Sequence, residues 1–86
     1  METNRETITR ADAEAKRLGA KYGIAWQKLR YGVTDPYEAK AISQALAGLY
    51  DTEPVPYRKK PVTDLTEMLV IAQALADRRN GVRNAH

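Results

Sequence analysis

Apolar residues recur at intervals of three and four along most of this 86-residue chain. That spacing places them on one side of an α-helix, and nowhere do apolar and polar residues alternate over the length of a β-strand. The first stripe consists of Ile8, Ala11, Ala15, Leu18 and Tyr22. We therefore expect an all-α fold, with residues 1–86 forming one domain, a compact bundle of about four helices.

Glycines bound the first two helices. The first helix ends at Gly23 and starts near either Thr3 or Thr9, because each threonine has an acidic residue three positions later, as in a capping box. A short helix over residues 24–31 follows, and Gly32 ends it in a left-handed conformation.

The pair Asp35-Pro36 predicts the start of a third helix, which runs to about Tyr50. Aspartate accepts hydrogen bonds from the free amide N–H groups, and proline presets the backbone angle of the first helical residue. Its predicted buried stripe is Ala39, Ile42, Ala45, Leu46 and Leu49. The many alanines imply close approach of a neighbouring helix.

Residues 51–62, DTEPVPYRKKPV, contain three of the four prolines and predict an extended linker. Thr63 and Asp64 then precede a last helix over residues 64–79. The remaining residues, 81–86, are expected to be a disordered tail.

The composition narrows the class of protein. There is no cysteine, so the hydrophobic core or a partner must stabilise the fold without disulfides or a thiolate zinc site. The polar N-terminus and the absence of a long apolar run predict a cytoplasmic protein with no membrane contact.

Positive charge is concentrated in the first third of the chain. The net charge is +3, and residues 10–32 hold six basic side chains against two acidic ones. Further basic residues cluster in two places, Arg58-Lys59-Lys60 and Arg78-Arg79 with Arg83. One face of the protein is thus expected to attract phosphates, and the alternative is ordinary solvated surface charge.

The sequence offers no recognisable set of catalytic side chains. The only histidine is His86, the only serine is Ser43 inside a predicted helix, and Asp35 already serves as a helix cap. The five glycines are scattered singly, which does not match a phosphate-binding loop. We therefore expect no catalysis, no metal and no cofactor.

The stretch AKRLGAKYGIAWQKLRYG, from Ala15 to Gly32, resembles the helix-turn-helix family of DNA-binding domains. The matching positions are Leu18 and Gly19 as the apolar and small pair, Tyr22 before the turn, Gly23 at the turn, and Ile24 with Leu29 beyond it. Two positions depart from the pattern, since Gly19 stands where alanine is commoner and Gly32 where an apolar residue is expected.

This resemblance implies that the second helix reads DNA with outward-facing side chains. The residues predicted to bind nucleic acid are Lys21, Trp26, Gln27, Lys28, Arg30 and Tyr31, joined by Arg58, Lys59 and Lys60 from the linker. Each has a structural alternative. Trp26 is also suited to the core, Lys28 and Arg30 to a solvated helix face, and residues 58–60 to a stiff, soluble linker.

Three functions are therefore considered. The first is a small DNA-binding regulator, expected to be dimeric, from a phage, plasmid or bacterial chromosome, because residues 23–41 also resemble segments of phage and mobile-element proteins. The second is a protein-interaction module that uses the alanine-rich stripes of the third and fourth helices. The third is a mobile-element inhibitor that binds a nucleic-acid-handling complex.

Overall fold

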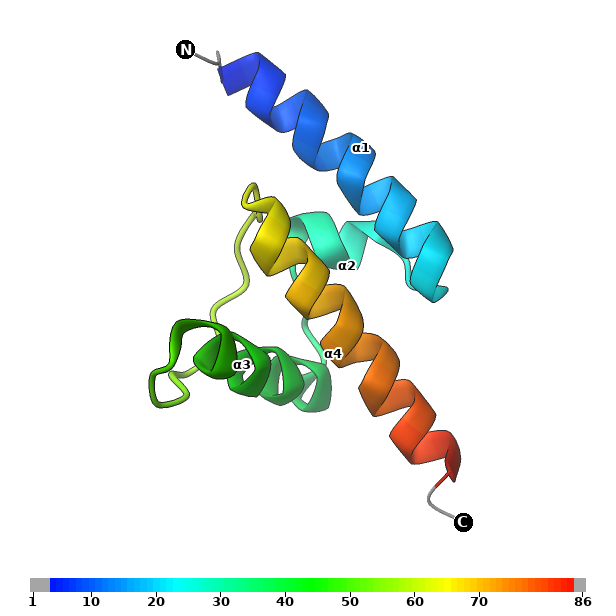
Figure 1. The fold of residues 1–86 in the computed structure, drawn as a ribbon, viewed down its shortest axis with the longest axis vertical. Coiled ribbons are helices and arrows are strands. Elements are labelled where there is room, and N and C mark those ends of the chain that lie inside the picture. The colour runs from blue at the N-terminus through cyan, green and yellow to red at the C-terminus, as the bar shows by residue number, and fades with distance from the viewer. Residues whose placement is uncertain (1–3, 85–86) are drawn as a thin grey trace.

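The computed structural model describes residues 4–84, with side chains for residues 4–79. The described chain forms four helices and contains no strand (Figure 1). They are α1 (Asn4–Tyr22), α2 (Trp26–Tyr31), α3 (Pro36–Tyr50) and α4 (Leu65–Asn84). The predicted all-α class is confirmed.

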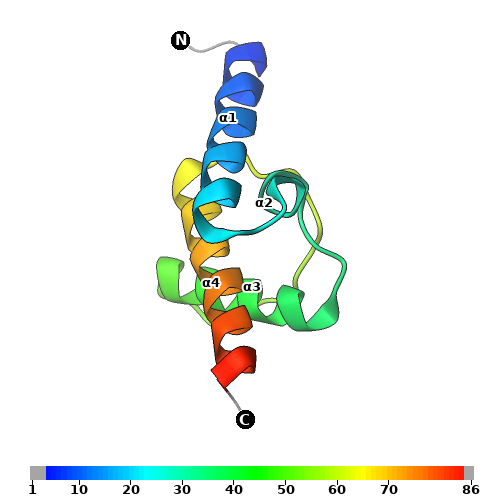
Figure 2. The same cartoon turned by 90° about the vertical axis from the view of Figure 1, so that its right-hand side faces the viewer.

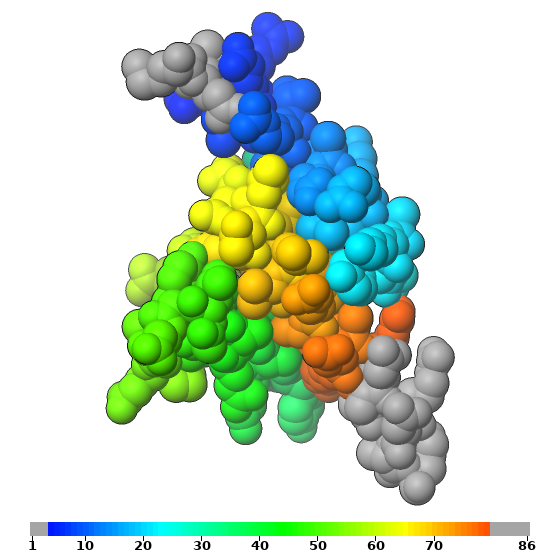
Figure 3. Space-filling model, in the orientation of Figure 1, coloured from blue at the N-terminus to red at the C-terminus, as the bar shows by residue number. Residues whose placement is uncertain are grey.

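Helix α4 is the centre of the bundle. It packs against α1, α2 and α3, whereas α1 and α3 make no contact with each other along their described lengths. Figure 3 shows α4 lying between α1 and α3 on one face of the molecule. The buried residues of α4 are Met68, Ile71, Ala72, Leu75 and Ala76. The alanine-rich stripes of α3 and α4 are therefore largely used within the core.

Helix α1 is only half covered. Ala11, Ala15 and Leu18 are fully buried, but Ile8 is 47% exposed because the first two turns extend past the end of α4 (Figures 1 and 2). The prediction that Ile8 belongs to the buried stripe is wrong. The start at Asn4 agrees with the earlier of the two predicted starts, although Thr3 itself lies outside the described residues.

The turn between α1 and α2 depends on two glycines. Gly23 has a φ of 67°, a conformation in which other residues are strained. Gly19 lies directly beneath the turn, and its carbonyl oxygen accepts a hydrogen bond of 2.9 Å from the amide of Ile24. A Cβ at Gly19 would be 2.6 Å from the carbonyl oxygen of Ile24. Glycine therefore stands at this position because the backbone after the turn approaches too closely for alanine.

The end of α2 also requires glycine. Gly32 has a positive φ of 97°, and a positive φ was predicted. Its ψ of −179° is, however, extended rather than left-handed helical. A Cβ there would be 2.6 Å from the hydroxyl of Tyr57. The chain consequently leaves α2 in an extended direction, with later residues packed against it.

Helix α3 starts as predicted. The carboxylate of Asp35 accepts hydrogen bonds from the amides of Tyr37 (2.7 Å) and Glu38 (3.1 Å). The bond from Glu38, followed by that from Tyr37, lowers the pKa of Asp35. Ile42 and Ala47 are buried, whereas the predicted stripe residue Leu49 is 36% exposed. The buried face includes Ala47 because α3 is covered by residues after it as well as by α4.

Those covering residues form an extended segment, 51–64, which we call the strap. The hydroxyl of Ser43 donates to the carbonyl of Val55, and the hydroxyl of Tyr57 accepts a 2.9 Å bond from the amide of Val33. Val62 is buried in the core. The segment is extended, as predicted, but it is packed along the bundle instead of linking two helices freely.

Helix α4 begins after Asp64, whose carboxylate accepts a 3.0 Å hydrogen bond from the amide of Glu67. It continues to Asn84, five residues beyond the predicted end. A glycine inside a helix costs only about 1 kcal/mol relative to alanine, so Gly81 does not end it. Residues 81–84 of the predicted disordered tail are thus helical, and residues 85–86 lie outside the described residues.

The close approach at Gly19 yields a stability prediction. Gly19→Ala should lower the free energy of unfolding by about 1 to 3 kcal/mol because the new methyl group forces the α1–α2 turn outward. Gly48→Ala is the matched control, since Gly48 lies in α3 with nothing within 4 Å of its Cβ position. The control should raise stability by about 0.5 to 1 kcal/mol through helix propensity. Urea unfolding measures both, and equal effects of the two changes would contradict the packing assigned to Gly19.

Candidate nucleic-acid interface

Arg30 does not face outward. Its side chain is 5% exposed, its Nε donates a 2.7 Å hydrogen bond to Asp12 Oδ1, and its Nη1 donates a 3.2 Å bond to the carbonyl of Val62. The prediction that Arg30 lies on an outer recognition face is wrong. The reason is that α2 is only six residues long and is enclosed by α1 on one side and the strap on another, so Arg30 lies between them.

Lys28 is also bound within the protein. Its Nζ lies 2.8 Å from Glu38 Oε2 in the first turn of α3. The lysine side chain is 43% exposed and the glutamate 17% exposed, so solvent still screens the pair. Lys28 remains at the surface, but a neighbouring carboxylate offsets its charge.

The two aromatic residues of α2 differ in exposure. Trp26 is partly buried against the core, and Tyr31 is 43% exposed. Their ring centroids are 6.0 Å apart with an angle of 54° between the planes. Lys16 on α1 places its Nζ 5.0 Å from the Trp26 ring centroid, a cation–π distance. Gln27, next to Trp26, is exposed.

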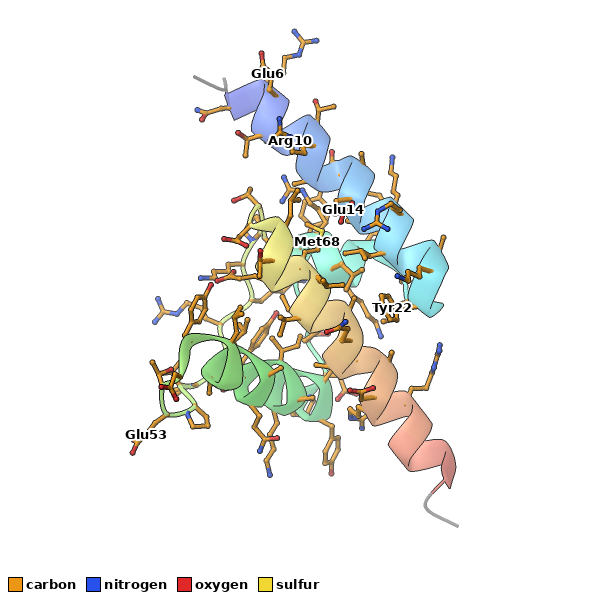
Figure 4. All side chains as sticks on the ribbon, in the orientation of Figure 1. Glu6, Arg10, Glu14, Tyr22, Glu53 and Met68 are labelled. Atoms are coloured by element: carbon orange, nitrogen blue, oxygen red, sulfur yellow. The ribbon has the colours of Figure 1, made fainter. Side chains whose placement is uncertain are left out.

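The three basic residues of the strap are divided between two places. Lys59 lies against the end of α2, since its Cγ would be 2.9 Å from a Cβ at Gly32. Arg58 and Lys60 line a groove of about 270 Å³ between α3, α4 and the strap, and the backbone amide of Lys60 also lies near Gly32. The groove has an apolar lining that includes Ile42, Leu46 and Ile71. Glu53, which also lines it, extends away from the molecule in Figure 4.

Lys21 lies at the end of α1, exposed, with its Nζ 5.5 Å from the ring centroid of Tyr22. Tyr22 projects beside α4 (Figure 4), where its hydroxyl is 3.5 Å from Gln73 Nε2. Arg79 of α4 closes the same region by donating to the carbonyls of Gly23 (2.8 Å) and Tyr22 (3.0 Å). Arg79, predicted as part of a basic cluster, therefore caps the last carbonyls of α1.

The two aromatic rings of α2 and the residues next to them define a region that we call the Trp26–Tyr31 surface. Its members are Lys16, Trp26, Gln27, Tyr31 and Lys59. They come from α1, α2 and the strap. Among the described side chains, neither Lys16 nor Lys59 forms an ion pair. The surface therefore combines aromatic rings with two cations that form no ion pair among the described side chains.

The sequence did not single out Lys16 or Asp12. Lys16 was one of six cations in the basic first third, and its contact with Trp26 arises because the Gly23 turn folds α2 back against α1. Asp12 was counted only as a charge, yet it anchors Arg30 from another helix. Neither contact follows from helical spacing, because each joins residues that are ten or more positions apart.

The described part of the chain contains no group of three histidine, cysteine, aspartate or glutamate side chains placed to hold a metal ion. None of the four helices has the length and apolar character to cross a membrane within its described residues. Comparisons of the chain with protein-family models, with curated proteins and with solved structures gave no match.

The Arg30 contacts lead to a second stability prediction. Asp12→Ala should lower the free energy of unfolding by about 1.5 to 3 kcal/mol, since it leaves a buried guanidinium with only the Val62 carbonyl as partner. Glu14→Ala is the control, because Glu14 pairs with Arg17 on the exposed face of α1. That variant should have nearly wild-type stability. Thermal unfolding followed by circular dichroism compares the two, and a stable Asp12→Ala protein would contradict the structural role of Arg30.

Proposed function

We propose that the protein binds DNA through the Trp26–Tyr31 surface, with Lys21 beside it. The observation that carries this proposal is that lysines without an ion pair on α1 and the strap accompany the exposed ring of Tyr31 and the partly buried ring of Trp26 on α2. Ammonium groups contact phosphates, and aromatic rings contact the planar faces of bases or the sugar. DNA is the partner expected from the sequence. Lys16 joins the predicted residues of the site, whereas Lys28 and Arg30 form ion pairs within the protein.

The packing of α1 and α2 supports the same proposal. Leu18, Gly19 and Leu29 are buried, and Gly23 has the positive φ needed for the turn. These are positions on which the resemblance to helix-turn-helix domains rests. The resemblance implies that the second helix is presented to DNA by the first, and the buried anchors support this proposal by holding α2 against α1.

The range of base contacts open to α2 is narrow. Six residues at 1.5 Å each make a helix about 9 Å long, and its two basic residues are engaged by Asp12 and Glu38. Gln27 is left as the exposed polar side chain able to pair with a base edge. We therefore expect binding to depend mostly on phosphate contacts, with weak preference for base sequence. A role as a sequence-specific regulator has less support than DNA binding itself.

A salt series tests the proposal. If Lys16, Lys21 and Lys59 each neutralise one phosphate, the logarithm of the binding constant should fall with the logarithm of salt concentration with a slope of about −3. Replacing any one of them by alanine should reduce the slope by about 1 and weaken binding to all sequences alike. Lys40→Ala, which removes an exposed lysine on α3 outside this surface, should bind as the wild type does. Fluorescence anisotropy with labelled random duplex DNA gives these values.

Absence of binding at low salt, or a Lys40→Ala variant as impaired as Lys16→Ala, would contradict the proposal. Light scattering on the same samples measures whether the protein is dimeric, as the sequence led us to expect. A negative result would turn attention to the alternative, a protein partner.

A further inference from the structure

We infer that Tyr31 is a stacking site for an unpaired base, so that the protein binds single-stranded DNA more tightly than duplex. This inference rests on the proposed function and names the form of DNA that the Trp26–Tyr31 surface prefers. It is carried by the position of the Tyr31 ring relative to the cations and the indole around it.

The side chain of Tyr31 is partly exposed, and neighbouring side chains restrict its ring. It is 43% exposed, and the guanidinium carbon of Arg30 lies 5.1 Å from its centroid. Arg30 is held by Asp12 and by the Val62 carbonyl, so this cation cannot move away from the ring. A buried cation beside the ring and the neighbouring indole of Trp26 restrict the tyrosine and leave part of its surface open to a ligand.

A second exposed tyrosine shows what is particular to Tyr31. Tyr37 on α3 is 69% exposed and also has an arginine near it, with the Arg78 guanidinium carbon 5.6 Å from the ring centroid. No second aromatic ring lies beside Tyr37 among the described residues. Tyr31, in contrast, contacts Trp26, which in turn lies under Lys16. Tyr37 is therefore a matched exposed ring without the surrounding site.

The cations near Tyr31 suit a nucleic-acid strand. Lys16 reaches the surface through its contact with Trp26, and Lys59 lies against Gly32, the residue that follows Tyr31. A base stacked on the ring would thus have ammonium groups available for its flanking phosphates. In a duplex each base is covered by its neighbours, so only an unpaired base presents a free face to the tyrosine.

The inference is tested by comparing a fluorescein-labelled oligothymidylate of about twelve nucleotides with a duplex of equal length. Wild-type protein should bind the single strand more tightly. Tyr31→Ala should weaken single-strand binding about tenfold, the loss typical of one stacked base, and should weaken duplex binding by a clearly smaller factor. Tyr31→Phe, which keeps the ring, and Tyr37→Ala should both bind the single strand as the wild type does.

Trp26 adds a site-specific readout because it is the only tryptophan in the chain. A base stacked on Tyr31 would lie near the indole, whose ring is 6.0 Å from that of Tyr31. The oligothymidylate should therefore quench the Trp26 fluorescence in the wild type and in Tyr31→Phe, and much less in Tyr31→Ala at equal saturation. Quenching that is equal in Tyr31→Ala would overturn the stacking site.

The two proposals fail in different ways. If Tyr31→Ala binds the single strand normally while Lys16→Ala and Lys59→Ala lose affinity for duplex, stacking is rejected and DNA binding stands. If Tyr31→Ala weakens both forms equally, Tyr31 has no preference for an unpaired base and the inference is again rejected. If the wild type binds neither form, both proposals are rejected together.

Discussion

The buried guanidinium of Arg30 joins the parts of the molecule on which the candidate interface is built. It pairs with Asp12 of α1 and donates to the carbonyl of Val62 in the strap, while its own carbonyl accepts a 2.8 Å bond from the Val62 amide. A charge placed this deep is tolerated only when its donors are used, and no buried side-chain polar atom among the described residues lacks a partner. The short helix α2 therefore keeps its position through tertiary contacts, since six residues are too few for a helix that is stable by itself.

The glycines around α2 determine where those contacts are possible. Gly19 allows the chain after the turn to approach α1, and Gly32 allows the hydroxyl of Tyr57 to reach the end of α2. Helix α4 supports this arrangement from the other side, with Met68 fully buried and Arg79 bonded to the carbonyls at the turn. The small core of this chain is thus supplemented by close backbone packing and by specific hydrogen bonds.

Local signals in the sequence predicted the helices well but did not predict the tertiary contacts of the candidate site residues. Asp35-Pro36 and Gly23 act through their own backbone conformations, so their effects can be recognised from neighbouring residues alone. The burial of Arg30 depends instead on its contacts with Asp12 and Val62, which lie 18 and 32 positions away. The burial of Ala47 in place of Leu49 likewise depends on the strap. The path of the strap across α3 cannot be predicted from helical periodicity.

The charge of the first third illustrates why composition alone gives an incomplete account of function. Among its cations, Arg17 pairs with Glu14, Lys28 with Glu38 and Arg30 with Asp12. A sequence count treats all six alike, whereas the field that reaches a phosphate comes mainly from cations without a nearby carboxylate. Lys16 forms no ion pair among the described side chains, and it acquires an aromatic neighbour only because the turn brings Trp26 beneath it. The surface that we propose for DNA binding is therefore a product of tertiary packing, because α1 and the strap contribute single residues to it beside those of α2.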